Sequence, residues 1–240
     1  MTMSLESLLI SQDAALLGVL RPTLEKISVD LHVCAGAHPC SDVLRKRKFD
    51  AIIIDCDDLD NGIDLLKCLR QTQSNAKSVA FAVVNGETTT QEAFQYGANF
   101  VLQKPLTTLH AARCFNAALN FMVREHCRYF RHSVEIPLRI VFPHDQEITA
   151  TSTNLSEGGM AIRLLGKLQK DSEALFRFTL PGINVPLELR GQVAWADGSG
   201  HAGIRFVAVP QTSQHQLEKW LIDRLQEKMP HHLQGYLTLN

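Results

Sequence analysis

The sequence has no long hydrophobic run, no excess of either charge and no strongly basic segment. Its 240 residues include 24 Lys and Arg against 25 Asp and Glu, a formal net charge of −1 at pH 7. Proteins that bind duplex DNA through its phosphates are usually basic, so DNA is not an expected partner. No stretch approaches the roughly 18 apolar residues that span a bilayer, and the first residues lack the features of a secretory signal. We therefore expect a cytoplasmic protein without a membrane segment.

Cysteine is scarce and scattered. The six cysteines follow no spacing typical of a disulfide framework, and several lie in apolar stretches, so we expect buried thiols. One short segment offers four candidate zinc ligands, but no second ligand pair follows it. These candidates are His32, Cys34, His38 and Cys40. His32 and Cys34 alternate along an expected strand, which favours structural roles, and no metal site is predicted.

The residues that are present form an ordinary globular composition, with 45% hydrophobic, 7% aromatic and 20% charged residues. This supplies enough apolar mass for a sizeable core, and the length favours two domains. We expect a first domain over residues 1–123, a second over 124–230 and a carboxyl-terminal tail over 231–240.

The first domain alternates between strands and helices. The apolar runs at 51–55 and 79–84 are typical of strands that are buried on both faces of a parallel sheet. Amphipathic stretches such as 106–123 separate the strands. Five such repeats predict an α/β fold with an open parallel sheet of flavodoxin-like order and helices on both faces. In such sheets, functional residues lie at the carboxyl ends of the strands.

Two segments at these strand ends, FDAIIIDCDDLDNGIDLLKCLR and YGANFVLQKP, resemble a response-regulator receiver domain. The resemblance places Asp55 in the phosphoacceptor position and Lys104 at the end of the fifth strand. It implies a divalent cation, held by an acidic pair after the first strand, that offsets the charge of the transferred phosphoryl group. Here that pair is Ser11 and Gln12, which supply no negative charge, and Asp13 follows one position too late.

The hydroxyl that receivers carry after the fourth strand is also missing, because Val84 or Asn85 stands there. We therefore predict a pseudo-receiver that is not phosphorylated, in which Asp55 is a structural carboxylate facing Lys104. The acidic run from Asp55 to Asp60 does not fit a calcium-binding EF-hand, because a leucine falls at a ligand position and no glutamate closes the loop. A solvated loop is expected there.

The second domain consists of short alternating runs separated by turns. Six such runs predict a small antiparallel β-barrel. A terminal helix follows, with an apolar stripe that includes Trp220. The six expected strands lie at 134–142, 147–154, 160–166, 174–182, 185–196 and 201–209.

Three segments of this domain, RYFRHSVEIPLRIVF, NLSEGGMAIRL and GQVAWADGSGHAGIRFVAV, resemble a PilZ domain. The resemblance implies binding of the bacterial second messenger cyclic di-GMP. The family uses an RxxxR motif before the first strand and a (D/N)xSxxG turn after the second. The turn is intact as Asn154, Ser156 and Gly159, whereas the family spacing makes Arg131 the second motif arginine and puts Cys127 in place of the first.

Arginine suits this ligand because a guanidinium pairs with phosphate or with the guanine edge and stacks on a base. Arg128 matches an additional arginine of the family, and Arg124 makes a shifted RxxxR pair with Arg128. Whether residues 124–131 continue the preceding helix is left open by the sequence. Gly158 and Gly159 are expected to turn the backbone with positive φ.

The leading hypothesis is a bacterial signalling protein that is not an enzyme and needs no cofactor. Its barrel senses cyclic di-GMP, and its pseudo-receiver provides a surface for a homo-oligomer or an unknown protein partner. The apolar residues Phe115, Leu119 and Phe121 of the last receiver helix exceed what one sheet face needs, which favours the oligomer. The alternative is a ligand-free adaptor: Cys127 in place of the motif arginine has abolished dinucleotide binding, and both domains act through protein contacts. An enzyme is disfavoured because no nucleophile, base and orienting group recur at a recognised spacing.

Overall fold

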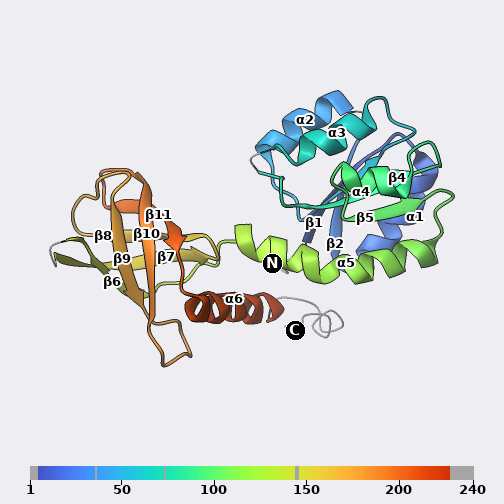
Figure 1. Ribbon diagram of the computed structural model, residues 1–240. Coiled ribbons are helices and arrows are strands. Elements are labelled where there is room, and N and C mark those ends of the chain that lie inside the picture. Colours follow the sequence, from blue (N-terminus) through green and yellow to red (C-terminus); the bar gives the residue numbers. More distant parts are fainter. Residues whose placement is uncertain (1–4, 36, 73, 144–145, 228–240) are drawn as a thin grey trace. The chain divides into compact units, whose positions relative to one another are not determined.

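The computed structural model describes residues 5–35, 37–72, 74–143 and 146–227, without the side chains of residues 37–41 (Figure 1). The described residues fall into two compact units, one that ends at His126 and one that begins at Cys127. Each unit has a hydrophobic core of its own. The expected tail over 231–240 lies outside the described residues.

The first unit is a five-stranded parallel sheet in the order β2-β1-β3-β4-β5 with helices on both faces, which confirms the predicted flavodoxin-like fold. In Figure 1 its elements run from blue to green along the chain. They are β1 (Leu5–Ile10), α1 (Ala14–Glu25), β2 (Val29–Cys34), α2 (Ala37–Lys46), β3 (Ala51–Asp55), α3 (Gly62–Leu69), β4 (Val79–Val84), α4 (Thr90–Gln95), β5 (Phe100–Gln103) and α5 (Thr108–Tyr129).

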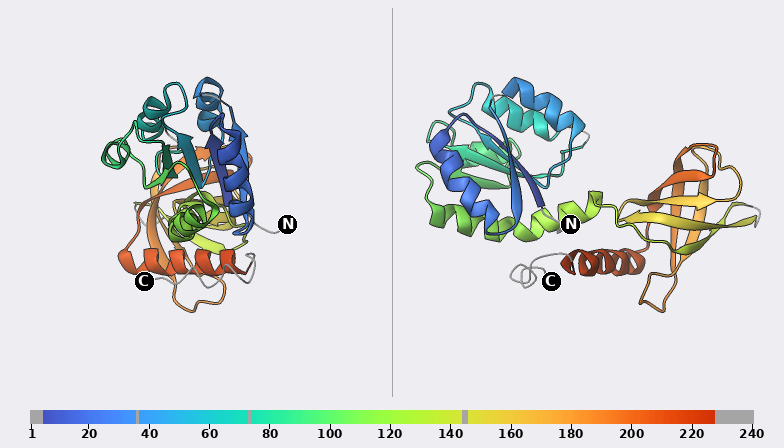
Figure 2. Two further views of the ribbon diagram at one scale, coloured as in Figure 1. Left: turned by 90° about the vertical axis from the view of Figure 1, so that its right-hand side faces the viewer. Right: turned by 180° about the vertical axis from the view of Figure 1, so that it is seen from behind.

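Every residue of β3 and β4 is buried, as expected for central strands that are covered on both faces. Helices α2 and α3 lie on one side of the sheet and α1 and α5 on the other (Figure 2). On the α5 side, the rings of Phe81 and Phe115 lie 4.5 Å apart between centroids. Phe115 and Leu119 are fully buried within this unit, so the expectation that they form an apolar surface excess is wrong; Phe121, 57% exposed, does face solvent.

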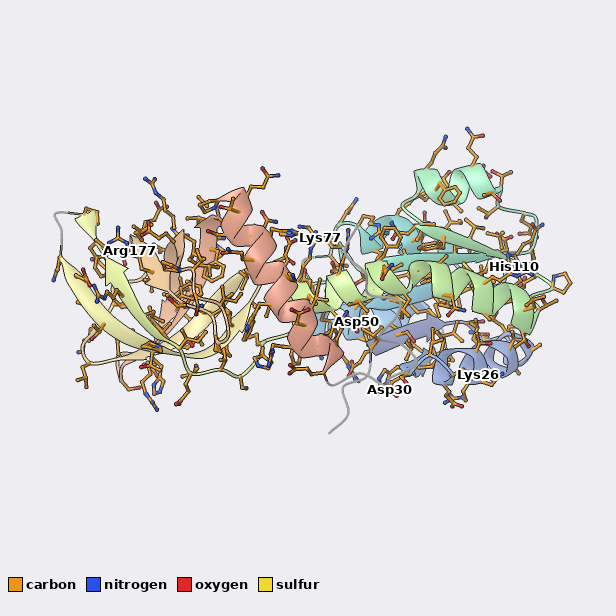
Figure 3. All side chains as sticks on the ribbon, turned by 90° about the horizontal axis from the view of Figure 1, so that it is seen from below. Lys26, Asp30, Asp50, Lys77, His110 and Arg177 are labelled. Carbon is orange, nitrogen blue, oxygen red and sulfur yellow. The ribbon has the colours of Figure 1, made fainter. Side chains whose placement is uncertain are left out.

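Helix α5 ends at Tyr129, beyond the expected end near residue 123. No glycine or proline interrupts this stretch, and polar contacts hold its last turns against the sheet. Glu125 forms an ion pair with Lys48, and the His126 Nδ1 atom lies 3.0 Å from both oxygens of Asp50, which is labelled in Figure 3. Asp50 also accepts a hydrogen bond from the backbone N–H of Glu6. The helix therefore continues through residues 124–129 of the stretch that the sequence left open, and residues 130–131 lie beyond its end.

The prediction that the cysteines are buried thiols holds for some of them. Burial raises the pKa of the Cys56 thiol to about 12 and that of Cys114 to about 11, with the nearby Asp57 and Asp55 adding to the effect at Cys56. Cys34 is disulfide-bonded, so the prediction of a thiol is wrong there. The side chains of His38 and Cys40 lie outside the described residues.

The second unit is a closed antiparallel barrel in the order β10-β11-β8-β7-β6-β9, followed by one helix, as predicted. Its elements are yellow to red in Figure 1. They are β6 (Pro137–Val141), β7 (Glu147–Ser156), β8 (Gly159–Leu164), β9 (Glu173–Phe178), β10 (Leu187–Ala196), β11 (His201–Ala208) and α6 (Gln211–Gln226).

Helix α6 contributes to the core of the barrel. Leu217, Trp220 and Leu221 are buried in one cluster with Phe176, and the Trp220 indole N–H donates a hydrogen bond to the Pro181 carbonyl at 3.0 Å. Trp220 is therefore an anchor between helix and barrel.

The inward and outward alternation of β10 changes at a bulge. The pairing register with β11 shifts between Val193 and Trp195, so Val193 is fully buried whereas Trp195 is 46% exposed. The bulge thus turns an aromatic side chain from the expected core position onto the outer face.

No described helix combines the length and the apolar composition that a bilayer crossing requires.

We predict that Trp220→Phe lowers the free energy of unfolding by about 1–3 kcal/mol, because the Pro181 carbonyl loses its donor. Urea unfolding followed by circular dichroism measures this loss. Trp195→Phe is the matched control and should change stability by no more than about 0.5 kcal/mol, because its side chain is partly exposed. Equal losses in the two variants would contradict the anchoring role of Trp220.

Candidate functional site

One lysine meets three carboxylates at the carboxyl edge of the parallel sheet. The Lys104 Nζ atom lies 2.9 Å from an oxygen of Asp13, 2.9 Å from an oxygen of Asp55 and 2.5 Å from an oxygen of Asp58. Asp55 ends β3, and the other three residues follow β1, β3 and β5, whose ends meet at this edge because the strands are parallel. We call these four residues and Ser11 the strand-end cluster.

Asp55 is the most buried member of the cluster, with 1% of its surface exposed. Its Oδ2 atom accepts hydrogen bonds from the Ser11 hydroxyl at 2.7 Å and from Lys104 at 2.9 Å. Its Oδ1 atom is buried and has no hydrogen-bond partner among the described residues. Ser11 thus donates to Asp55 where the receiver pattern has an acidic residue, whereas the neighbouring Gln12 is exposed.

The lysine and the carboxylates of the strand-end cluster stabilise one another in their charged forms. Burial of Lys104 opposes its charge, but hydrogen bonds to Asp58, Asp13 and Asp55 outweigh burial and raise the pKa of Lys104 above its ordinary value. The hydrogen bond from Lys104 lowers the pKa of Asp13, although burial works in the opposite direction. Lys104 and Asp13 are therefore both charged at neutral pH.

The acidic run after β3 is solvated, as predicted, at Asp58 and Asp60, but two of its carboxylates also make hydrogen bonds to the loop after β4. Asp57 Oδ2 accepts a hydrogen bond from the Asn85 backbone N–H at 2.7 Å, and Asp58 Oδ1 accepts one from the Asn85 side chain at 2.7 Å. Burial opposes the charge of Asp57, but hydrogen bonds from Thr88, Asn85 and Gly86 lower its pKa. The run thus fixes the loop after β4 through its contacts with Asn85.

The structure brings one group of carboxylates close enough to share a metal ion. Within the described ranges these are Asp13, Asp55 and Asp58, with ligand oxygens within 4.8 Å of one another. Asp13 reaches the cluster because it caps α1, accepting hydrogen bonds on Oδ1 from the next turn while Oδ2 faces Lys104. Lys104 contacts all three carboxylates and offsets one of their three negative charges.

The hairpin between β7 and β8 holds the polar turn of the barrel. The buried Ser156 hydroxyl donates to the Gly159 carbonyl at 2.9 Å, so it stabilises the hairpin internally. A Cβ atom on Gly159 would lie 2.1 Å from the Ile204 carbonyl oxygen, which means that β11 approaches too closely for a side chain. Neither Gly158 nor Gly159 has positive φ, so that expectation is wrong. Gly159 is required by close packing.

Two arginines reach this turn. A short antiparallel bridge joins His132 to Leu155 and lays the chain beside β7. The Arg131 Nη1 atom then donates to Asn154 Oδ1 at 3.4 Å, and the Arg128 Nε atom lies 3.7 Å from Glu157 Oε2. Arg131 is exposed, as is Arg128, so both guanidinium groups face solvent beside the hairpin.

The other two positions of the arginine motif differ from these. Cys127 is only 6% exposed on α5, so the first motif position is directed into the protein. Arg124 is exposed on the part of α5 that belongs to the first unit.

The sequence pattern missed Trp195, which lies on the same outer row as Asn154. Trp195 pairs with Gly203 on β11, Gly203 with Ala161 on β8, and Ala161 with Asn154 on β7. A Cβ atom on Gly203 would lie 2.0 Å from Trp195 Nε1, so the indole ring covers this glycine. The sequence signal was obscured because strict alternation directs Trp195 inward. We call Arg128, Arg131, Asn154 and Trp195 the turn surface.

Comparison with protein families identifies both units. The response regulator receiver domain model matches residues 8–112, and the PilZ domain model matches residues 125–223. The chain joins a receiver domain to a PilZ domain. Both are signalling domains rather than catalytic ones, so this is a signalling protein.

Several solved structures are similar to one part of the chain. The chemotaxis response regulator CheY4 of Vibrio cholerae is 18% identical over 48% of this chain and 98% of its own, with a TM-score of 0.44. The receiver domain of the sensor histidine kinase PA1611 from Pseudomonas aeruginosa PAO1 is 18% identical over 48% and 97%, with a TM-score of 0.42. The Bacillus subtilis inhibitor of motility MotI/DgrA is 21% identical over 43% and 53%, with a TM-score of 0.37. No curated protein matches the chain.

In the receiver domain, we predict that Lys104→Met lowers the free energy of unfolding by about 3–5 kcal/mol near neutral pH, because three carboxylates then face one another without a cation. The lowered pKa of Asp13 means that its stabilising contribution is present above the ordinary carboxyl pKa and is lost as the pH falls through the lowered value. The deficit of the variant should therefore be smaller at about pH 3, where protonation removes the repulsion, than near neutral pH. Urea unfolding at both pH values measures it.

The matched control is Lys67→Met, which removes an ion pair with Asp64 whose side chains are 43% and 66% exposed. This change should cost less than about 1 kcal/mol at either pH. A Lys104→Met deficit that is independent of pH would show that lost packing, rather than charge, explains it.

Proposed function

We propose that this protein is a bacterial effector that binds cyclic di-GMP on the turn surface of its PilZ domain, and that its receiver domain works without phosphorylation. The contact between Arg131 and Asn154, 23 positions apart in the sequence, carries the proposal. It joins the surviving arginine of the RxxxR motif and the first residue of the polar turn into one exposed surface.

The chemistry of the turn surface suits a cyclic dinucleotide. Its two phosphodiester groups need cations, and Arg128 and Arg131 offer two exposed guanidinium groups that can also pair with a guanine edge. The amide of Asn154 can donate to or accept from a base. Trp195 adds an exposed aromatic face in the same row, on which a base can stack.

The receiver domain supports a docking role. Lys104 supplies the positive charge that faces Asp55, and Ser11 and Gln12 leave no acidic pair for a cation. Helices α4 and α5 expose large apolar side chains, with Phe94 49%, Leu109 63% and Phe121 57% exposed. A homo-oligomer or a partner protein that covers these side chains stays a prediction.

A ligand-free adaptor is the second candidate, and the burial of Cys127 favours it. An arginine of the motif must reach solvent to meet a phosphate, but this position is directed into the protein. Arg128, moreover, has the carboxylate of Glu157 beside it. In this alternative, the receiver and PilZ domains act through protein contacts alone.

We predict that calorimetric titration detects cyclic di-GMP binding and that Arg131→Ala weakens it by roughly ten- to a hundredfold, because a charged hydrogen bond is lost. Trp195→Ala should weaken binding by about tenfold through lost stacking, and Trp195→Phe should retain most of the affinity. Arg190→Ala, which removes an exposed charge outside the turn surface, is the matched control and should leave affinity unchanged. An absence of heat at near-millimolar dinucleotide would reject the sensing proposal in favour of the adaptor.

We also predict that Asp55 stays unmodified when the protein is incubated with acetyl phosphate and magnesium, because Ser11 and Gln12 supply no acidic pair to hold the cation that offsets the incoming charge. Intact-mass spectrometry reads this directly. A Ser11→Asp and Gln12→Asp double variant, which restores the acidic pair, should bind magnesium more tightly than the wild type. A stoichiometric phosphoryl adduct on the wild type that disappears in Asp55→Ala would overturn the proposal for the receiver domain.

A further inference from the structure

The outer face of the barrel contains a concave region of about 840 Å³, which we call the outer groove. Five strands contribute to it, and Arg177, which lines it, is labelled in Figure 3. The lining side chains that matter here are Arg139, Thr149, Arg163, Leu165, Arg177 and Glu188.

The strand register explains why the arginines gather there. Arg139 on β6 pairs with Arg177 on β9 and with Thr149 on β7, which places the three on one row. The neighbours of Arg139 along the strand, Leu138 and Ile140, are buried, so alternation directs Arg139 outward. The side chains of Arg139, Arg163 and Arg177 are 68%, 57% and 46% exposed.

The guanidinium groups of the groove form exposed ion pairs. Arg177 lies 2.8 Å from Glu188, and the corresponding distances are 3.4 Å from Arg139 to Glu147 and 3.6 Å from Arg163 to Glu135. Exposed pairs of this kind contribute little stability, so a carboxylate of another molecule can replace them. Three guanidinium groups and the carboxylate of Glu188 line the groove, while Glu135 and Glu147 pair with Arg163 and Arg139 from beside it.

An apolar contact point lies at the rim of the groove. Leu165 is 101% exposed, and Val185, next to the lining residue Pro186, is 53% exposed. A fully exposed leucine beside a cluster of arginines gives the groove both an apolar and a charged part. Such a surface favours a partner that carries acidic groups and at least one apolar side chain.

The shape of the groove favours a peptide over the alternatives. The barrel is closed, so each strand is paired on both sides and an extended peptide cannot add to an edge. The lining arginines keep about half or more of their surface in solvent, whereas small-molecule sites bury most of their ligand. Recognition of acidic side chains by clustered arginines fits this lining.

We propose that the outer groove binds an acidic peptide segment of a partner protein. Carboxylates of the segment pair with Arg139, Arg163 and Arg177, and an apolar side chain packs against Leu165. The proposal is independent of dinucleotide binding, because Arg139 and Arg177 lie on β6 and β9 and the turn surface takes no residue from these two strands.

The test uses the full chain and a fluorescein-labelled peptide of about ten residues, in which a central leucine is flanked by Asp and Glu. Fluorescence anisotropy at low salt should show saturable binding. The Arg139→Ala and Arg177→Ala double variant should weaken it by at least about tenfold, and Leu165→Ser should weaken it a few-fold. The matched control is the Arg190→Ala and Lys219→Ala double variant, which removes the same charge outside the groove and should bind as the wild type does.

Four outcomes would overturn the proposal: no binding at near-millimolar peptide, equal binding of a peptide with Asn and Gln in place of the acids, equal loss in both double variants, or wild-type self-association that the Arg139→Ala and Arg177→Ala variant abolishes. The last would assign the groove to a second copy of the chain. Calorimetry with cyclic di-GMP on the same variant should match the wild type, which separates a failure here from a failure of the proposed dinucleotide site.

Discussion

The interaction of one ammonium group with three carboxylates governs the carboxyl edge of the receiver sheet. Asp55 is almost completely buried, and a buried carboxylate is costly unless a partner compensates it. Lys104 provides that compensation and also draws in Asp13 and Asp58. Through Asp58 the influence of Lys104 extends to Asn85 and the loop after β4. At an edge that in the receiver pattern depends on an added metal, the chain's own Lys104 thus offsets part of the negative charge.

Much of the fold could be predicted from the sequence, because the hydrophobic patterns of its strands arise from burial in a core. The uninterrupted apolar runs of β3 and β4 indicate burial on both faces, and alternation in the second half indicates strands with one face in the core. The terminal helix followed in the same way from its apolar stripe. These patterns reflect the burial of individual side chains, and the type of each residue indicates whether its side chain is buried.

The parts that sequence reasoning missed depend on geometry across elements. Trp195 faces outward because a bulge changes the phase of β10, and no local pattern marks that bulge. Asp13 and Asp58 join the cluster because capping and loop closure direct their carboxylates toward Lys104. The extension of α5 depends on contacts of Glu125 and His126 with residues far away in the sequence. Strand register also placed Arg139 beside Arg177, which their separation along the chain conceals.

The packing of Gly159 against Ile204 has a consequence for how the polar turn motif is interpreted. The glycine is imposed by the closure of the barrel, and the Ser156 hydroxyl is used up inside the hairpin, so both would be kept by a barrel that had lost every ligand. Two of the three motif residues, Ser156 and Gly159, thus serve the folding of the barrel. In the proposed dinucleotide site, Asn154 and Arg131, which contacts it, therefore carry more information about a ligand than the turn as a whole.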